Sequence, residues 1–434
     1  MGVKLLLAGW YGGEELFSAP EAPWPWLRRV ERWVRGAAEE LLESSRTVEG
    51  PRGPILFLRL HPAAEDVAIV AAGQGRVVVL ANTSMVGPGY HRYLCDLLHA
   101  MGDALHVDWA EPALTVAGVG DPTGYFHTGD ASDIAPRMLA WLGSMAGRVL
   151  DFRRHGHSGA TLSLRPGHGF EHPGALLTPM GPRDEAWLHA VHEDPLSGQD
   201  IFPWWEPGQG AATKLGRALS LIWTEMVWRP PLLEEERHRF REVARLLESA
   251  WREAPELAYP WREWQQVLGY LGVGGTLAEE VSRRAVEAPS GPLIGYRRGA
   301  VQVTLPEGWE IRIPGSLAEE RLADGSWVAR DHRRSVRFVP LQDDVEGIAP
   351  GPEQSLPYEF QHQGERVSGR ATLHVEPGDC RLTALCESGT HRALCVVSFD
   401  DPDEQDWALG TWRSLDHAVA ASRALPSPLG RGSG

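Results

Sequence analysis

A histidine-rich stretch near the middle of the chain has the residue types of a metal site. It reads DFRRHGHSGATLSLRPGHGFEHPG and covers residues 151–174. Its candidate metal ligands are His155, His157, His168 and His172. Neutral imidazoles bind zinc and other divalent transition metals, and two histidines one residue apart on a strand point to the same face. Glu171 would complete such a set, which predicts a metal-dependent hydrolase as one function for the chain.

The same stretch contains Arg154-His155-Gly156, which resembles the RHG element of histidine phosphatases. In that family the arginine holds a phosphate and the adjacent histidine becomes the nucleophile. The family places this element after a first apolar strand, whereas the residues from Met138 to Leu150 have helical periodicity. Glycine and proline interrupt the rest of the stretch, as they do in surface connections. We therefore expect a structural or partner-contacting loop without a stoichiometric metal ion, and we keep the metal site as the alternative.

Two further polar segments have simple structural interpretations. Residues 120–130, GDPTGYFHTGD, place Asp121, Thr123, His127 and Asp130 between glycines. This pattern is typical of a tight binding loop and equally of Asx turns that lead into a helix. The acids between residues 400 and 406 suit a helix N-terminus, whose dipole favours negative charge, and they lack the spacing of a calcium loop. No P-loop, dinucleotide fingerprint, G-x-S-x-G or H-E-x-x-H motif occurs in the sequence.

Composition and charge narrow the classes of partner. The chain has 434 residues and a formal net charge of −16, which disfavours nucleic acid and anionic membranes because both require a basic surface. No stretch approaches the roughly 18 apolar residues that a membrane-spanning helix needs. The four cysteines form neither a C-x-x-C pair nor a dense framework, so we expect buried, reduced thiols in a cytoplasmic protein. An acidic surface favours a protein partner with a basic surface.

Hydrophobic periodicity predicts a first domain at residues 1–150. A strand at residues 3–11 is followed by a helix with apolar positions from Trp26 to Leu41. The runs PILFLRL, DVAIVAA and RVVVLANTS then indicate an antiparallel meander. Helical spacing returns at residues 90–101, and another helix is expected from Ser132 to about Leu150. We expect an antiparallel sheet with helices on one face.

Residues 151–290 are predicted to form the histidine-rich loop followed by a helical block. Apolar stripes run over residues 215–226, 240–251 and 261–271. A fourth helix is expected to open at Thr276, because Glu279 three residues later completes a capping box. The tryptophans in these stripes have the spacing of core residues.

A third domain is expected at residues 291–420. Its strand-like runs begin at AVQVTLPEGWEI and end at RALCVVSF, and a helix-like PDEQDWALGTWRSLD follows. The VTLPEGW at 303–309, the strands after it and the WRSL at 412–415 resemble PsbP-like α/β modules. The resemblance implies a small curved sheet with flanking helices that binds other proteins and has no catalytic residues. Residues 421–434 are predicted to be a disordered tail.

Together these observations predict an α+β multidomain protein with three parts. They are an N-terminal antiparallel sheet with helices, a central helical block, and a C-terminal small curved sheet with flanking helices. We expect a non-catalytic bacterial protein-binding factor without a cofactor, such as an immunity or accessory protein of a toxin or phage-defence system. The alternative is a hydrolase that holds zinc or another divalent transition metal at the 151–174 loop. The sequence does not determine the oligomeric state.

Overall fold

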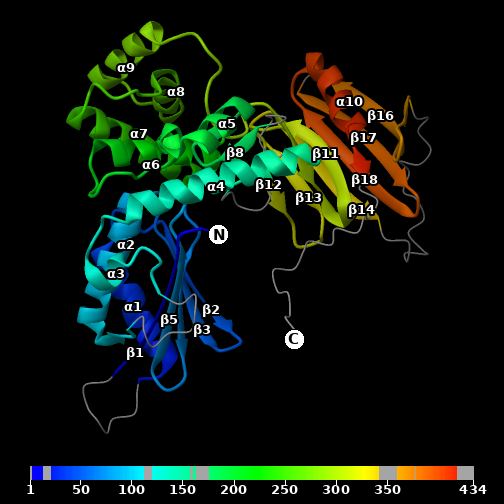
Figure 1. Ribbon diagram of the computed structural model, residues 1–434. Helices are drawn as coiled ribbons and strands as arrows, with labels where there is room; N and C mark the ends of the chain where they lie inside the picture. The colour runs from blue at the N-terminus through cyan, green and yellow to red at the C-terminus, as the bar shows by residue number, and fades with distance from the viewer. Residues whose placement is uncertain are drawn as a thin grey trace. The chain divides into compact units, whose positions relative to one another are not determined.

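The computed structural model describes residues 2–12, 21–111, 120–156, 160–162, 175–341, 359–376 and 378–417. These residues belong to two compact units. The first unit takes the described residues of Met1–Pro166, His172–Met226 and Arg237–Gly295. The second takes those of Val227–Glu236 and Tyr296–Gly434. Helices and antiparallel sheets occur along the chain, which confirms the predicted α+β multidomain fold (Figure 1).

The first unit contains a six-stranded antiparallel sheet in the order β2-β3-β4-β5-β1-β6. Its strands are β1 (Lys4–Tyr11), β2 (Ser44–Gly50), β3 (Gly53–Arg59), β4 (Val67–Ala72), β5 (Arg76–Asn82) and β6 (Val107–Trp109). The predicted meander is confirmed as β3, β4 and β5. Strand β2 was not predicted, because SSRTVEG has too few apolar residues for an alternating pattern to be visible.

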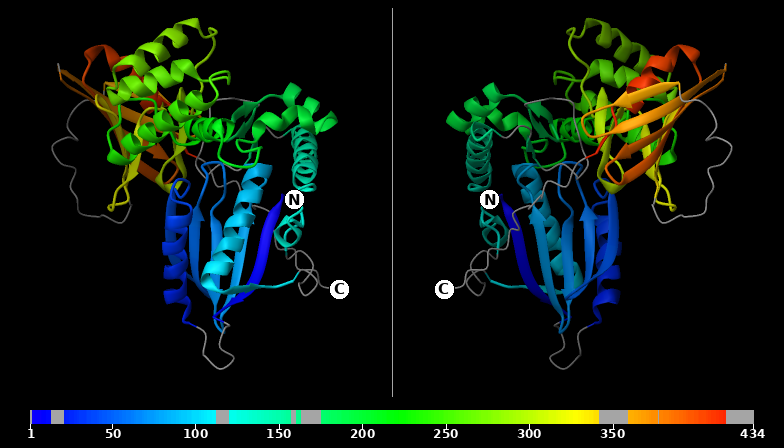
Figure 2. Two further views of the ribbon diagram at one scale, coloured as in Figure 1. Left: turned by 90° about the vertical axis from the view of Figure 1, so that its left-hand side faces the viewer. Right: turned by 90° about the vertical axis from the view of Figure 1, so that its right-hand side faces the viewer.

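Helices α1 (Pro23–Ala37) and α2 (Pro88–Leu105) cover one face of this sheet (Figures 1 and 2). Alternate residues of each strand point to these helices, so Leu5, Leu7 and Tyr11 of β1 are buried. Tyr11 stacks on Trp26 of α1 with 4.1 Å between the ring centroids. The helices therefore bury the expected apolar stripes against a single face of the sheet.

Three further helices follow, namely α3 (Tyr125–Thr128), α4 (Ile134–Arg154) and α5 (Glu185–Glu193). Helix α4 continues past its predicted end near Leu150, so residues 151–154 are helical and do not belong to a loop. Its buried residues include Met138, Leu142 and Ala146. A small sheet is formed by β7 (Ala160–Thr161), β8 (Leu176–Thr178) and β9 (Gly181–Arg183).

The predicted helical block is present. Its helices are α6 (Ala211–Thr224), α7 (Glu234–Glu253), α8 (Trp261–Leu271) and α9 (Thr276–Glu287). The capping-box prediction at Thr276 was wrong, because Gly275 is the N-cap and no side chain caps the helix. With a φ of 88°, Gly275 adopts a backbone conformation that glycine reaches without strain, and the helix entry depends on this turn.

A buried network of ion pairs joins the sheet of the first unit to α6 and α7. Its members are Glu43, Arg59, Arg217, Glu225, Arg239 and Glu242. Arg59 pairs with Glu43 at 2.6 Å and with Glu225 at 2.7 Å. Burial raises the pKa of Glu43 to about 7, against the opposing effect of the nearby arginines. The three cations and three carboxylates balance, which is the condition under which charges remain inside a protein.

The second unit contains a seven-stranded sheet in the order β12-β13-β14-β18-β17-β16-β15. Its strands are β12 (Ala318–Arg321), β13 (Trp327–Arg330), β14 (Arg334–Leu341), β15 (Phe360–Gln363), β16 (Ser368–Glu376), β17 (Asp379–Ser388) and β18 (His391–Phe399). A second sheet of three strands comprises β10 (Ala300–Thr304), β11 (Trp309–Pro314) and β19 (Asp416–His417). With seven strands, the larger of these two sheets is bigger than the small sheet that we expected for this segment.

Helix α10 (Gln405–Arg413) packs on this sheet as the predicted closing helix. Trp309 and Trp412 are fully buried in the core between the elements. Asp401 accepts a hydrogen bond from the amide of Asp403, in agreement with the helix-entry interpretation of the acidic run. All four cysteines are buried and free, as predicted. Within the described ranges, no helix has the length and apolar character to cross a membrane. The tail 421–434 lies outside the described residues.

Candidate interaction surface and buried polar cluster

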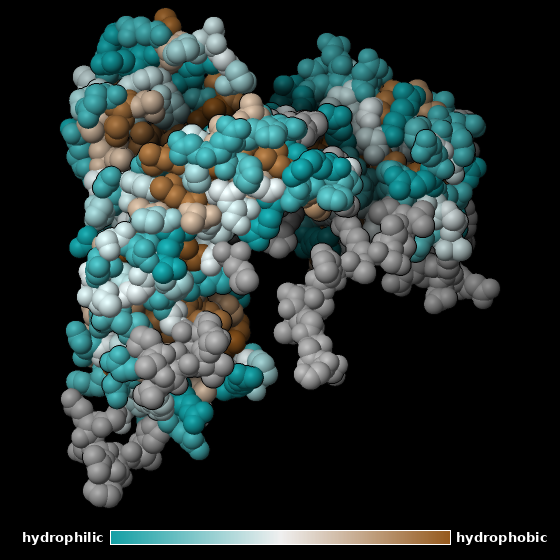
Figure 3. All heavy atoms as spheres, in the orientation of Figure 1, coloured by the Kyte–Doolittle hydropathy of each residue, from teal (hydrophilic) through white to brown (hydrophobic). Residues whose placement is uncertain are grey.

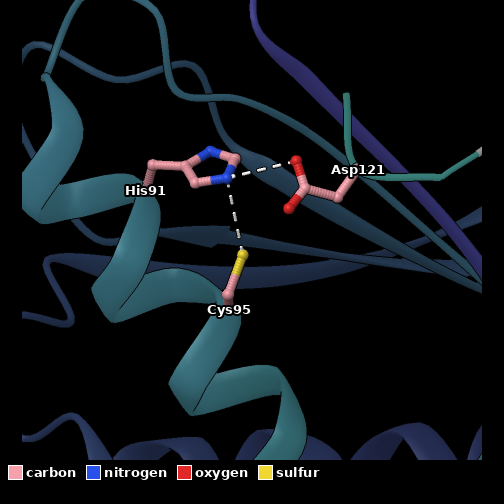
Figure 4. A group of neighbouring side chains, drawn as sticks. All are labelled: His91, Cys95 and Asp121. Atoms are coloured by element: carbon pink, nitrogen blue, oxygen red, sulfur yellow. Dashed lines mark hydrogen bonds and ion pairs between the residues drawn. The ribbon is translucent and has the colours of Figure 1, made fainter. Parts of the chain in front are cut away.

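A polar cluster lies inside the first unit, between α2 and the segment that precedes α3. His91 and Cys95 are one turn apart on α2 and therefore project from the same side of the helix. Asp121 reaches them from the segment after β6, which the bridge between Leu6 and Gly120 fixes beside β1. The three side chains point toward one another (Figure 4). The His91 and Asp121 side chains are fully buried, so the cluster has no access to solvent.

Hydrogen bonds hold the Asp121 carboxylate in place. It accepts bonds from the amides of Thr123 at 2.8 Å and Phe126 at 2.9 Å. The Thr123 hydroxyl donates to the same carboxylate. Burial raises the pKa of Asp121, but the nearby His91 and the hydrogen bonds from Phe126 and Thr123 outweigh burial and hold the pKa well below its usual range. The Asx-turn interpretation of residues 120–130 is thus confirmed at Asp121.

The arrangement does not support nucleophilic catalysis by Cys95. In a catalytic triad the nucleophile and the carboxylate contact opposite nitrogens of the imidazole. Here the Cys95 sulfur and the Asp121 carboxylate both approach Nε2 of His91, at 3.7 and 3.3 Å. Nδ1 contacts the Thr83 hydroxyl at 2.9 Å instead. Burial and the nearby Asp121 also raise the pKa of the Cys95 thiol, which keeps the sulfur protonated.

Only one of the four histidines proposed as metal ligands lies in the described part of the chain. His155 is the exposed C-cap of α4, and its Nδ1 donates a hydrogen bond to the carbonyl of Asp151 at 2.8 Å. His157, His168 and His172 lie outside the described residues, as does Glu171. The metal-site alternative at this loop therefore stays a prediction.

A second candidate feature is the face of the six-stranded sheet opposite α1 and α2, which we call the open sheet face. Its apolar residues are Leu6, Ala8, Trp10, Val48, Ile55, Phe57, Ala68, Val70, Ala72, Val78 and Leu80. All are partly or well exposed, and Trp10 and Leu80 expose 47% and 42% of their surface. Figure 3 shows hydrophobic residues where Figure 1 places strands of this sheet.

The strand register places these residues in two continuous rows. One row runs from Leu6 through Leu80 and Ala68 to Phe57. The next runs in parallel from Ala8 to Val48. With strands about 4.8 Å apart and about 3.3 Å between residues, the face covers on the order of 400 Å². This is the size of the largest apolar patch on a typical monomeric protein, and such patches are often functional.

Charged residues of both signs border the open sheet face. Lys4 of β1 and Arg76 of β5 are exposed on the same side of the sheet as the two apolar rows, and each lies just beyond one row. Arg46 lies over the Phe57 ring at 4.3 Å and pairs with Asp66 at 3.2 Å. Asp108 of β6 is the direct cross-strand neighbour of Trp10 on β1, so a carboxylate also borders the face. The face therefore combines an apolar centre with charged residues at its rim.

A polar pocket in the second unit offers a weaker candidate. It is lined by residues that include Arg330, Arg333 and Arg334. Arg333 pairs with Asp401 at 3.2 Å, and Arg334 makes hydrogen bonds to Glu404. Because Arg333 and Arg334 already have carboxylate partners, the pocket has little positive charge left for an anionic ligand.

Comparison of the chain with protein-family models and with curated proteins gave no match. The resemblance of the third segment to PsbP-like modules therefore stays a prediction. The sequence patterns indicated Asp121 as part of a possible binding loop, but they did not indicate His91 or Cys95 as residues of a site. The spacing of a histidine and a cysteine four residues apart in a predicted helix was the one signal that could have indicated them.

Proposed function

We propose that this protein is a non-catalytic binding factor that docks a partner protein on the open sheet face. The observation that carries the proposal is the pair of apolar rows across β1, β5, β4 and β3, which include the exposed Leu80 and lie beside the exposed Trp10. Trp10 is a suitable anchor because exposed tryptophans contribute most strongly when a partner buries them. The buried cluster at His91 supports the non-catalytic part, since no substrate reaches it.

The charges at the face favour one class of partner. An apolar surface bordered by carboxylates would meet Lys4 and Arg76 while covering the two apolar rows. A second copy of this chain would instead bring these cations near one another. The basic partner expected from the net charge would suit other surfaces of the chain. A narrower role as an immunity or accessory factor belongs to the same proposal, and a partner encoded next to this gene would support it.

The test compares two exposed leucines. Leu80 lies on the open sheet face, and Leu196 lies in the short helix at Pro195–Ile201 with 54% of its surface exposed. Leu80→Glu places a charge in the proposed contact and should weaken binding by roughly 2 kcal/mol, about 30-fold in Kd. Leu196→Glu should leave binding unchanged. Because both leucines are exposed, neither substitution should prevent folding.

The wild-type protein and both variants are used as bait in a lysate of the native host. A protein captured by the wild type and Leu196→Glu, but lost with Leu80→Glu, is then purified and its binding measured by calorimetry. Capture that is equal for all three proteins would refute the role of this face. Size-exclusion chromatography with light scattering tests the alternative, because a wild-type dimer that Leu80→Glu dissociates would identify a second copy as the occupant.

A further inference from the structure

We infer that His91, Cys95 and Asp121 bind one zinc-class transition-metal ion as a structural site inside the first unit. The ligand atoms of the three residues all lie within 4.8 Å of one another. Imidazole nitrogen, thiolate sulfur and carboxylate oxygen are the three donor types that protein zinc sites use. Figure 4 shows the three side chains converging from α2 and from the segment before α3. This site is independent of the proposed docking function.

The two separations from the His91 nitrogen to the other donor atoms are those of a coordination shell. Zinc bonds of about 2.0–2.1 Å to nitrogen and oxygen and about 2.3 Å to sulfur, at tetrahedral angles, put nitrogen about 3.3 Å from oxygen and about 3.6 Å from sulfur. Nε2 of His91 lies 3.3 Å from Oδ1 of Asp121. It lies 3.7 Å from Sγ of Cys95. A charge-assisted hydrogen bond between a histidine and a carboxylate would be shorter, at about 2.7–2.9 Å.

The surroundings fix the ligands in the way that metal sites require. Nδ1 of His91 contacts the Thr83 hydroxyl, which in turn donates to the carbonyl of Val3 at 3.2 Å. This chain of bonds leaves Nδ1 as the donor and directs the lone pair of Nε2 toward Asp121 and Cys95. Thr123 Oγ1 lies 3.0 Å from Nε2 and 2.9 Å from Oδ1 of Asp121, so its hydroxyl is the candidate for a fourth ligand.

The charges also balance in the protein interior. One divalent ion, a carboxylate from Asp121, a thiolate from Cys95 and a neutral imidazole sum to zero. On coordination the Cys95 thiol releases its proton to solvent and its sulfur binds the ion. Because the His91 and Asp121 side chains are fully buried, the ion would have no open position for substrate, and its role would be to hold α2 against the segment before α3.

The experiment uses the full chain, without a histidine tag, produced in medium supplemented with Zn²⁺. Elemental analysis should find about one zinc per chain. The protein refolded with Co²⁺ should show the sulfur-to-cobalt charge-transfer absorption, and Cys95→Ser should lose it. Thr83→Val, which removes the hydroxyl that contacts Nδ1 and donates to the carbonyl of Val3, leaves all three ligands in place and should weaken metal binding by roughly 10- to 100-fold. The control His155→Ala/His157→Ala should keep the metal.

Two outcomes would overturn the inference. One is a wild-type protein with substoichiometric metal whose thermal unfolding is the same with Zn²⁺ and with a chelator, since the cluster would then be a hydrogen-bonded network only. The other is metal that is lost in the His155→Ala/His157→Ala control while Cys95→Ser retains it. That result would place the ion at the 151–174 loop.

Discussion

Removing one arginine from the buried ion-pair network should strongly destabilise the first unit. Arg217 is 4% exposed and contacts Glu43 at 3.4 Å and Glu242 at 3.0 Å. Its guanidinium also donates to the carbonyl of Leu60 at 3.2 Å. In Arg217→Met the Leu60 carbonyl and Glu242 lose this donor, and Glu43, whose side chain is 1% exposed, loses its ion pair with Arg217 and keeps the one with Arg59.

The magnitude follows from the burial of the charges that remain. Breaking a buried ion pair by truncating one partner costs about 3–5 kcal/mol, because the other charge stays desolvated. Methionine recovers part of this by packing its apolar chain, so we expect a loss of about 3–4 kcal/mol. For a unit of this size, 1 kcal/mol shifts Tm by about 2–4 °C, which predicts a fall in Tm of roughly 10 °C.

Differential scanning calorimetry can test this expectation. The matched control is Arg283→Met, which removes an exposed arginine on α9 that pairs with Glu280 and Glu287 at the surface. Exposed ion pairs contribute little, so the control should unfold at the wild-type temperature. Equal unfolding temperatures for Arg217→Met and the wild type would show that the network does not stabilise the unit. An equal fall in both variants would show that burial does not set the cost.

Three further predictions concern stability. The raised pKa of Glu43, about 7 against 4.5 when unfolded, means that the folded state holds a proton the unfolded state has lost, so the contribution of Glu43 to stability should fall from pH 4.5 to 7. In urea unfolding, the stability of the wild type relative to Glu43→Gln should fall over this range, and a constant difference between the two would contradict it. Burial raises the pKa of Glu236, but hydrogen bonds from Arg229 and two backbone amides outweigh burial and lower it, so its stabilisation is present above pH 4.5 and is lost in acid. Glu236→Gln should therefore lower the free energy of unfolding at pH 7 and have little effect at pH 3, and equal losses at both values would refute the assignment. Gly216→Ala would place a Cβ 2.1 Å from the Pro203 carbonyl oxygen and should destabilise, whereas Gly269→Ala meets open space and should be neutral or stabilising; similar thermal unfolding of the two variants would contradict this contrast.

Local patterns in the sequence were sufficient to predict most elements. The alternation in VAIVAA indicates β4, and the stripe from Phe240 to Trp251 indicates α7, because side chains repeat every two residues in a strand and every 3.6 in a helix. Boundaries were less accurate, as the extension of α4 to Arg154 illustrates. Helix ends depend on what the last turn contacts, which local periodicity does not contain.

The two candidate sites depend on tertiary structure for different reasons. His91 and Cys95 meet Asp121 only because the bridge between Leu6 and Gly120 brings a distant segment beside α2. The sequence specifies these residues but not their distance, since about 25 residues of unspecified path lie between Cys95 and Asp121. In the histidine-rich stretch, by contrast, the spacing of the histidines indicated His155 as a metal ligand. In the structure its imidazole donates a hydrogen bond to the carbonyl of Asp151 in the last turn of α4.

The open sheet face shows the same division most clearly. The alternation of β1 and β5 determines that Leu6, Ala8, Val78 and Leu80 share one side of the sheet. Both sides of these strands carry apolar residues, and the order of the elements predicted helices on one side only. Only the tertiary structure decided which of the two apolar sides α1 and α2 cover. Periodicity fixes the side to which each residue points, whereas the long-range packing of helices determines which side remains exposed to a partner.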